Sequence, residues 1–183
     1  MKKFELTSET KINIFGKKLF RIKALISFGN VEAGETGGWV EKEENVNQSG
    51  DAWVSGNAEV SGNARVSGNA EVSGNAWVSG NAWVSGNAMV SGNAWVSGNA
   101  MVSGNARVSG NADYTTIRGF GTQFRTTTFF RCKDKQVKVS CGCFYGTIPE
   151  FREQVKNTRK GKIAEEYLMI ADLMEKHFAE EAK

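Results

Sequence analysis

The hydrophobic and polar positions of residues 49–112 repeat every six residues, in the order Ser-Gly-Asn/Asp-Ala-x-Val. Each complete unit places a valine two residues after an alanine, and ten such valines run from Val54 to Val108. A period of six fits neither the α-helix nor the heptad, and Gly and Asn in every unit disfavour a helix. Residues two apart in a strand share one face, so each Ala-x-Val predicts a short strand with Ala and Val inward and x outward.

The Ser-Gly-Asn segments predict corners, because Gly accepts left-handed backbone and Asn tolerates it better than most residues. Strands this short do not make stable hairpins with one another, so we expect the chain to coil. The repeat resembles the hexapeptide-repeat left-handed β-helix, in which an aliphatic residue and a small residue two places before it fill a triangular prism. The resemblance implies left-handed, parallel coils of three units, with residues 18 apart stacked on one face.

Flanking segments predict caps for the two ends of this prism, where unprotected strand edges would otherwise lie. Residues 1–48 read as an N-terminal β cap, with strands at Lys11–Phe15 and Leu19–Phe28 separated by a turn at 16–18. Residues Trp39–Gln48 add an imperfect coil beneath the regular repeat. The β-helix itself is assigned to residues 49–112.

Residues 113–183 predict a small α+β unit that ends in an amphipathic helix. Its expected elements are strand-like segments at 115–130 and 137–141, a helix beginning near Pro149 with Thr147 as its N-cap, and the amphipathic helix at 163–178. Such a helix needs a partner surface, either on the prism or on a neighbouring subunit. The fold class is therefore mainly β: a hexapeptide-repeat parallel β-helix with an N-terminal β cap and a C-terminal α+β unit.

Charge and cysteine content narrow the range of functions. The net charge of +3 combines 23 basic with 20 acidic residues, which does not favour a long nucleic acid as partner. No apolar run reaches the roughly 18 residues of a membrane span and no signal-peptide core follows the first residues, so we expect a cytoplasmic protein with reduced thiols. Cys132, Cys141, Cys143 and His177 lack the usual zinc spacing; we expect no metal and no cofactor, and a tight Cys-Gly-Cys turn of packed thiols.

The outward positions become apolar in the upper coils. They are, in order, Trp53, Glu59, Arg65, Glu71, Trp77, Trp83, Met89, Trp95, Met101 and Arg107. A soluble monomer does not usually show so large an apolar area to water. Three covers are compatible with the sequence: a homo-oligomer interface, a ligand stacked on the aromatic faces, or the C-terminal helix. The resemblance favours a homotrimer packed prism against prism, with small-molecule sites in the clefts between subunits.

Two sets of candidate residues follow. The candidate oligomer interface is Trp77, Trp83, Met89, Trp95 and Met101. The candidate ligand-binding residues are Arg65, Trp77, Trp83, Trp95, Met101, Arg107 and Arg125, since nucleobases stack on aromatic side chains and arginine pairs with phosphate.

The sequence disfavours an enzyme, because the repeat lacks the features that catalysis would need. Hexapeptide-repeat acyltransferases use a histidine base beside the prism, whereas the single histidine, His177, lies in the terminal helix and no loop interrupts the repeat. Motifs of other enzyme classes are absent from the sequence. We therefore expect a protein that is not an enzyme and has no catalytic residues.

The whole chain also resembles small hexapeptide-repeat proteins of bacteriophages and prophages, through its repeats and the following R-T-T-T-F-F and C-G-C-F-Y-G-T-I-P-E-F segments. Some phage β-helix proteins act as anti-defence sponges, which sequester nucleotide signals of bacterial antiviral immunity without cleaving them. The resemblance implies a homotrimer in a bacterial cytoplasm that binds a cyclic dinucleotide or a related nucleotide. A purely structural scaffold or protein-interaction module is the alternative.

Overall fold

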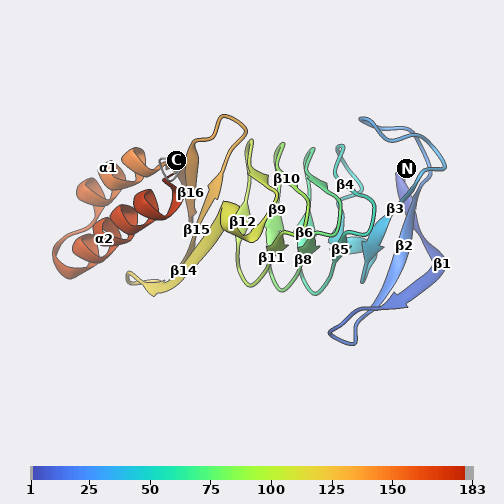
Figure 1. Cartoon of the computed structure of the whole chain (residues 1–183), viewed down its shortest axis with the longest axis horizontal. Helices are drawn as coiled ribbons and strands as arrows, with labels where there is room; N and C mark the ends of the chain where they lie inside the picture. The colour runs from blue at the N-terminus through green and yellow to red at the C-terminus, as the bar shows by residue number, and fades with distance from the viewer. Residues whose placement is uncertain (1, 180–183) are drawn as a thin grey trace.

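The centre of the molecule is a stack of short parallel strands, seen in a computed structural model that describes residues 2–179 (Figure 1). The strands are β4 (Trp53–Val54), β5 (Glu59–Val60), β6 (Arg65–Val66), β7 (Glu71–Val72), β8 (Trp77–Val78), β9 (Trp83–Val84), β10 (Met89–Val90), β11 (Trp95–Val96), β12 (Met101–Val102) and β13 (Arg107–Val108). Each strand from β4 to β10 pairs with the strand three units further along, which gives the three faces β5–β8–β11, β6–β9–β12 and β4–β7–β10–β13. The predicted parallel β-helix is therefore confirmed, as is the stacking of residues 18 apart.

Alanine and valine fill the interior of these coils, as the repeat predicts. Every repeat valine from Val54 to Val108, and every repeat alanine from Ala52 to Ala106, is at most 1% exposed. Full burial of a valine side chain contributes about 1.5–3 kcal/mol relative to exposure. The β-helix is thus held together by one continuous apolar column along its axis.

The corners of successive coils are stacked as regularly as the strands. The corner glycines have left-handed backbone, for example φ +68° at Gly68 and +67° at Gly98. The side-chain amides of corner asparagines form ladders, with N–O distances of 3.0–3.4 Å, in the series Asn57–Asn75–Asn93, Asn63–Asn81–Asn99 and Asn69–Asn87–Asn105. Each coil therefore positions the next through backbone and amide hydrogen bonds.

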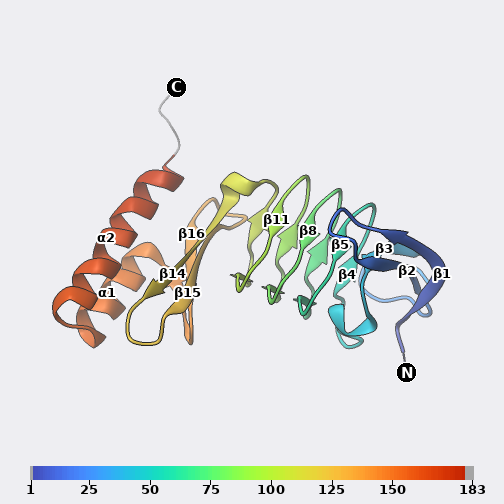
Figure 2. The same ribbon diagram turned by 90° about the horizontal axis from the view of Figure 1, so that it is seen from below.

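The N-terminal cap is an antiparallel sheet that continues into one face of the β-helix. Strands β1 (Phe4–Ile12), β2 (Lys18–Ala24) and β3 (Thr36–Val40) pair in that order, and β3 then pairs in parallel with β5. An isolated parallel bridge joins Val46 to Val66, so the expected imperfect coil is present beneath the regular ones. Figure 2 shows β5, β8 and β11 in one row between this cap and the C-terminal sheet.

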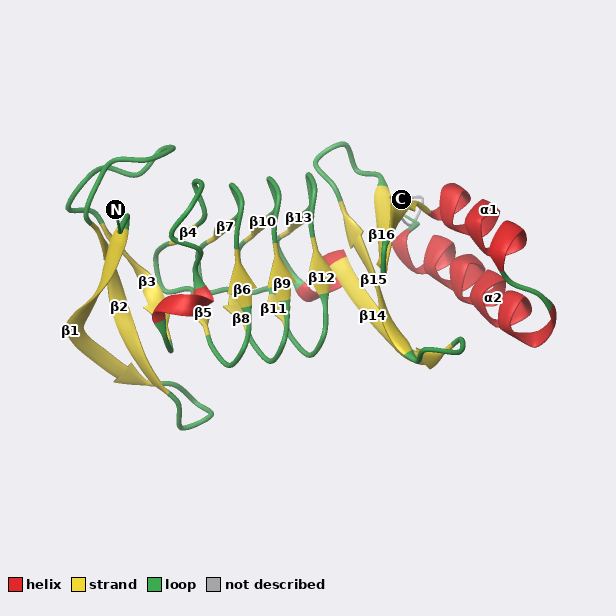
Figure 3. Ribbon diagram, turned by 180° about the vertical axis from the view of Figure 1, so that it is seen from behind, coloured by secondary structure: helices red, strands yellow, loops and turns green. Residues whose placement is uncertain are grey.

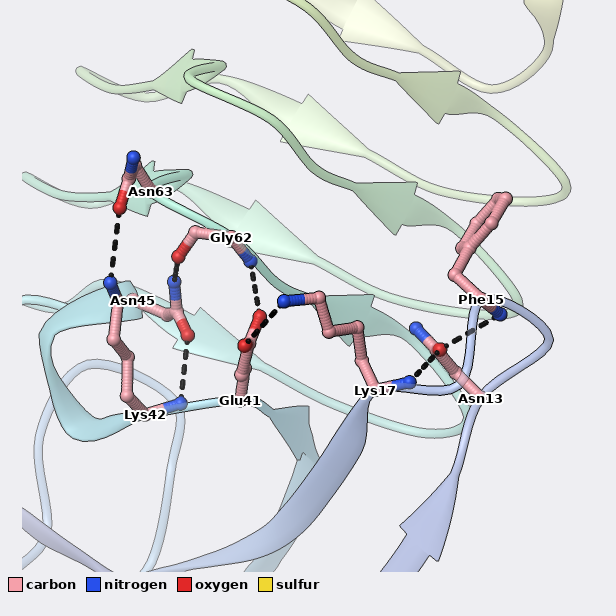
Figure 4. Close-up of polar contacts among 8 residues, drawn as sticks. All are labelled: Asn13, Phe15, Lys17, Glu41, Lys42, Asn45, Gly62 and Asn63. Atoms are coloured by element: carbon pink, nitrogen blue, oxygen red, sulfur yellow. Dashed lines mark hydrogen bonds and ion pairs between the residues drawn. The ribbon is translucent and has the colours of Figure 1, made fainter.

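Polar contacts link the cap to the first regular coils (Figure 4). One oxygen of Glu41 accepts a hydrogen bond of 2.6 Å from the Gly62 N–H, and the other lies 3.2 Å from the Lys17 ammonium. The bond from the Gly62 backbone is the main cause that lowers the pKa of Glu41. Asn45, which ends the 3₁₀ helix η1 (Glu43–Asn45), donates to the carbonyls of Gly62 and Ala64 at 3.1 and 2.8 Å. The edge of the first coil is thereby satisfied within the chain.

The C-terminal unit closes the other end with a four-stranded antiparallel sheet. Its strands, in sheet order, are β14 (Tyr114–Phe120), β15 (Arg125–Arg131), β16 (Val137–Cys141) and β17 (Phe144–Thr147), preceded by the 3₁₀ helix η2 (Asn111–Asp113). One side of the sheet completes the apolar column of the β-helix with Phe130 and Cys132. The segment at 115–130, expected to be strand-like, forms two strands and the turn between them.

The two helices lie on the far side of that sheet from the β-helix (Figures 1 and 3). Helix α1 (Ile148–Thr158) is capped by Thr147, whose hydroxyl accepts from the Glu150 N–H, as the sequence predicts. Helix α2 (Gly161–Phe178) packs Tyr167 and Met174 against α1 and the sheet. The amphipathic helix therefore has its partner surface in its own unit and does not lie on the prism. Neither helix within residues 2–179 combines the length and hydropathy that crossing a bilayer requires.

Candidate functional site

The candidate residues are distributed over several surfaces of the chain. Successive outward residues lie on different faces, while residues three units apart share one. Trp77 and Trp95 lie on β5–β8–β11, Arg65, Trp83 and Met101 on β6–β9–β12, Met89 and Arg107 on β4–β7–β10–β13, and Arg125 on β15. A single chain therefore places Trp77 and Trp95 on one face and Arg65, Trp83 and Met101 on another. It does not unite the whole set of candidate residues in one cleft.

An aromatic surface, formed by Phe15, Trp77 and Trp95, covers part of the β5–β8–β11 face. The three rings have centroids 5.7 Å apart in every pair. The side chain of Asn13 accepts hydrogen bonds from the backbone of Phe15 and Lys17, which shapes the hairpin tip that carries Phe15 (Figure 4). Trp77 is half-buried, whereas Phe15 and Trp95 are 51% and 42% exposed.

Phe15 belongs to this surface, although the sequence does not single it out as a candidate residue. The sequence predicts a cap strand over Lys11–Phe15, whereas β1 ends at Ile12 and the following residues form the hairpin tip. The alternation of this segment does not reveal that the tip bends over the β-helix. Trp53 is covered in a similar way, since Phe4 and Phe28 pack against its indole and leave it 4% exposed. The chain's own cap therefore covers part of the outward aromatic area.

A hollow of about 400 Å³ lies beside Trp83 on the β6–β9–β12 face. The indole is 47% exposed, and its N–H donates to the Ser67 hydroxyl of the previous coil at 3.0 Å, which fixes the orientation of the ring. Arg65 lies one coil below Trp83 and in register with it, and Arg65 is exposed. Within residues 2–179 no carboxylate lies within ion-pair distance of Arg65. The hollow thus offers a fixed aromatic face and a guanidinium available to a ligand.

Two carboxylates from the segment around η1 line the same hollow. Glu43 is engaged by the Lys2 ammonium at 2.8 Å and by the Gln48 amide at 3.0 Å. Glu44 is exposed, and no basic group of the described chain lies within ion-pair distance of it. An anion in this hollow is therefore attracted by Arg65 and repelled by Glu44, and the side of Arg65 is the more favourable place for a phosphate.

A second, smaller hollow of about 330 Å³ adjoins Trp95 where the β-helix meets the C-terminal sheet. The Tyr114 hydroxyl donates to the Trp95 carbonyl, and the Asn111 side chain accepts from the Trp95 N–H at 2.8 Å. Burial raises the pKa of Tyr114 above its usual range. The lining is polar and carries no charged side chain, so it offers hydrogen bonds without a charge for phosphate.

Met101 and Arg107 lie in the last coils, next to the C-terminal unit. The Thr128 hydroxyl of β15 accepts a hydrogen bond of 3.0 Å from the Met101 N–H, and Met101 is half-buried. Arg107 and Met89 are half-buried too, in register with each other on their face. The chain's own sheet, and not its terminal helix, thus lies against one of the expected interface residues.

The cysteines occupy three different environments. Cys132 is buried at the end of the apolar column, where burial raises the pKa of its thiol to about 11. Gly142, with φ +63°, forms the predicted tight Cys-Gly-Cys turn, but Cys143 is exposed and not packed. His177 packs edge-on against Phe178, with centroids 4.9 Å apart. Within residues 2–179 no group of three or more His, Cys, Asp and Glu side chains is placed to hold a metal ion.

The stacked coils, their Ala and Val interior and the corner ladders define a β-helix repeat protein. Comparison with protein families agrees with this class: the model described as YdcK beta solenoid repeat matches residues 70–86, 82–98 and 94–110. The matched segments lie within the β-helix and include neither end unit. No curated protein gives a match to this chain.

Proposed function

We propose that the protein is a non-catalytic, self-associating β-helix that sequesters a cyclic nucleotide signal of bacterial antiviral defence beside Trp83 and Arg65. The observation that carries the proposal is the hollow at Trp83, where a half-exposed indole of fixed orientation lies next to an arginine that has no acidic partner among the described residues. A nucleobase stacks on such a ring, and a guanidinium pairs with phosphate.

Two exposed aromatic areas on different faces support the proposed self-association. In a cyclic trimer each interface joins two different surfaces of neighbouring subunits. The aromatic surface at Phe15 and Trp95 supplies one, and the face of Trp83 supplies the other. Burial of the exposed parts of these three rings contributes a transfer free energy on the order of 8 kcal/mol. This gain lies within the range of about 4–15 kcal/mol that association costs. The adjoining outward residues of both faces have to supply the remaining free energy that makes association favourable.

Light scattering tests the self-association. We expect the wild-type protein to show three times the mass of one chain, and Phe15→Lys with Trp95→Lys to show the mass of one, because both lysines place charge in the interface. Met169→Lys with Leu173→Lys is the matched control, since these side chains are 63% and 58% exposed on α2. A monomeric wild type, or a control pair that also dissociates, would contradict this interface.

Nucleotide binding is tested by thermal unfolding with cyclic dinucleotides. We expect the midpoint to rise with ligand concentration, because a ligand that binds only the folded state stabilises it. Arg65→Gln should weaken binding about tenfold or more through loss of a charge-assisted hydrogen bond, while Glu44→Gln should strengthen it by removing repulsion. Arg118→Gln, at an exposed arginine of β14, is the control and should bind as the wild type does.

The same measurements separate the two candidate functions. A trimer whose midpoint does not move with any cyclic nucleotide would refute the sponge. The aromatic surface would then favour the alternative, a scaffold or protein-interaction module.

A further inference from the structure

A pocket of about 450 Å³ lies in the C-terminal unit, away from the outward residues of the β-helix. It is lined by the turn between β14 and β15, the Cys-Gly-Cys turn, the second half of α1 and Tyr167 of α2. Its lining residues include Gln123 from the first turn, Arg125 from the start of β15, Cys143 from the second turn, Gln154 from α1 and Arg159, which follows the last residue of α1. None of the lining residues is acidic, so its charge is purely cationic.

The two arginines line the same pocket as the Tyr167 phenol. Burial raises the pKa of Tyr167, and the nearby positive charges of Arg159 and Arg125 act in the opposite direction. In the part of the chain that the structure describes, neither has a carboxylate within ion-pair distance. The Arg125 side chain extends over Gly142, where a Cβ would collide with its guanidinium, so the glycine leaves the space for the arginine.

Three aromatic residues also line the pocket, Phe144, Phe151 and Tyr167. Phe151 packs against Phe144 and Tyr167 with centroid distances of 5.4 and 5.8 Å, the second pair perpendicular. The Tyr167 hydroxyl donates to the Phe120 carbonyl at 3.2 Å, which leaves its oxygen able to accept. A pocket lined by two arginines and by aromatic rings is complementary to a molecule with an anionic head and a flat apolar body.

We propose that this pocket binds a small organic anion, whose phosphate or carboxylate pairs with Arg125 and Arg159 and whose ring packs on Phe144 and Phe151. The site shares no residue with the hollow at Trp83. It places Arg125, counted from the sequence with the β-helix arginines, in a separate site. The binding does not depend on the proposed sequestration of a cyclic nucleotide.

Protection of Cys143 from alkylation tests the proposal. Cys143 is exposed and lines the pocket, whereas Cys132 is buried with its thiol pKa raised to about 11 and serves as an unreactive internal reference. We treat the full-length protein with iodoacetamide and measure the rate at each cysteine by peptide mass spectrometry. The probes are adenosine 5′-monophosphate and benzoate, with adenosine as the uncharged control.

We expect at least one anion, at saturation, to slow alkylation of Cys143 about tenfold, with little effect of adenosine. Protection by the nucleotide alone identifies phosphate as the required head, and protection by benzoate shows that a carboxylate suffices. Arg125→Gln with Arg159→Gln should abolish the protection, while Arg118→Gln should retain it. No protection by either anion, equal protection by adenosine, or protection that survives loss of both arginines would overturn the proposal.

The variant Arg65→Gln separates this site from the proposed function. It alters the hollow at Trp83 and leaves every residue of the C-terminal pocket unchanged, so Cys143 should be protected as in the wild type. Loss of the cyclic-nucleotide effect with retained protection would therefore refute the sponge alone. Retained nucleotide binding without protection would refute the organic-anion site alone.

Discussion

Val84→Asp is expected to leave little or no folded protein at neutral pH. Val84 is fully buried in β9 and stacks between Val66 and Val102 of the neighbouring coils. A carboxylate there has no hydrogen-bond donor other than backbone groups already used in the ladders, and it costs more than about 4 kcal/mol whether it stays charged or takes up a proton. This is a large part of the total stability of about 5–15 kcal/mol of a typical domain. Circular dichroism and the denaturant midpoint report the loss.

The matched control is Asn87→Asp, which introduces the same charge at an exposed corner of the β-helix. It removes one exposed hydrogen bond of 3.4 Å to Asn105 and should cost about 1 kcal/mol or less. If Val84→Asp unfolded close to the wild-type midpoint, the assignment of the valines to the interior would be wrong.

Gly68→Ala is expected to destabilise the protein clearly more than Gly98→Ala. The two glycines have nearly equal φ values, +68° and +67°, so the left-handed backbone costs an alanine about 1–2 kcal/mol at either position. A Cβ on Gly98 meets no atom within 4 Å, whereas a Cβ on Gly68 would lie 3.1 Å from the backbone N and O of Gly86. This overpacking should add about 1–3 kcal/mol at Gly68, for a total of about 2–5 kcal/mol.

Urea unfolding of both variants measures the difference directly, and each serves as the control of the other. Equal losses of stability would show that backbone strain alone explains the corner glycines. A larger loss at Gly98 would contradict the close stacking of the corners.

The strands and their stacking could be predicted because the repeat leaves one consistent solution. Valine and alanine two residues apart must share a face, and every unit has the same length, so three units per coil place Trp77 below Trp95 and Arg65 below Trp83. The position of the cap could not be predicted in this way. Phe15 reaches Trp77 across more than sixty residues of sequence, through a hairpin whose direction no local pattern determines.

The candidate site was predictable to the same extent. The 18-residue spacing brings Arg65, Trp83 and Met101 to one face. It does not show that Thr128 contacts Met101 or that Glu44 lines the same hollow as Arg65. The surroundings of Arg125 could not be predicted from the sequence. Its neighbours come from the turn at Gly142 and from the end of α1, and only the packing of the helices on the C-terminal sheet brings them together.

The stacked coils also make the length of the β-helix adjustable in fixed steps. Each coil presents the same hydrogen-bonding edge above and below, so deletion or duplication of 18 residues moves the two end units by about 4.8 Å along the axis and preserves their relative rotation. A change of six residues would instead turn the C-terminal unit by one third of a revolution against the cap. Only insertions or deletions of whole coils therefore keep the aromatic surface and the pocket at Arg125 on their present sides of the molecule.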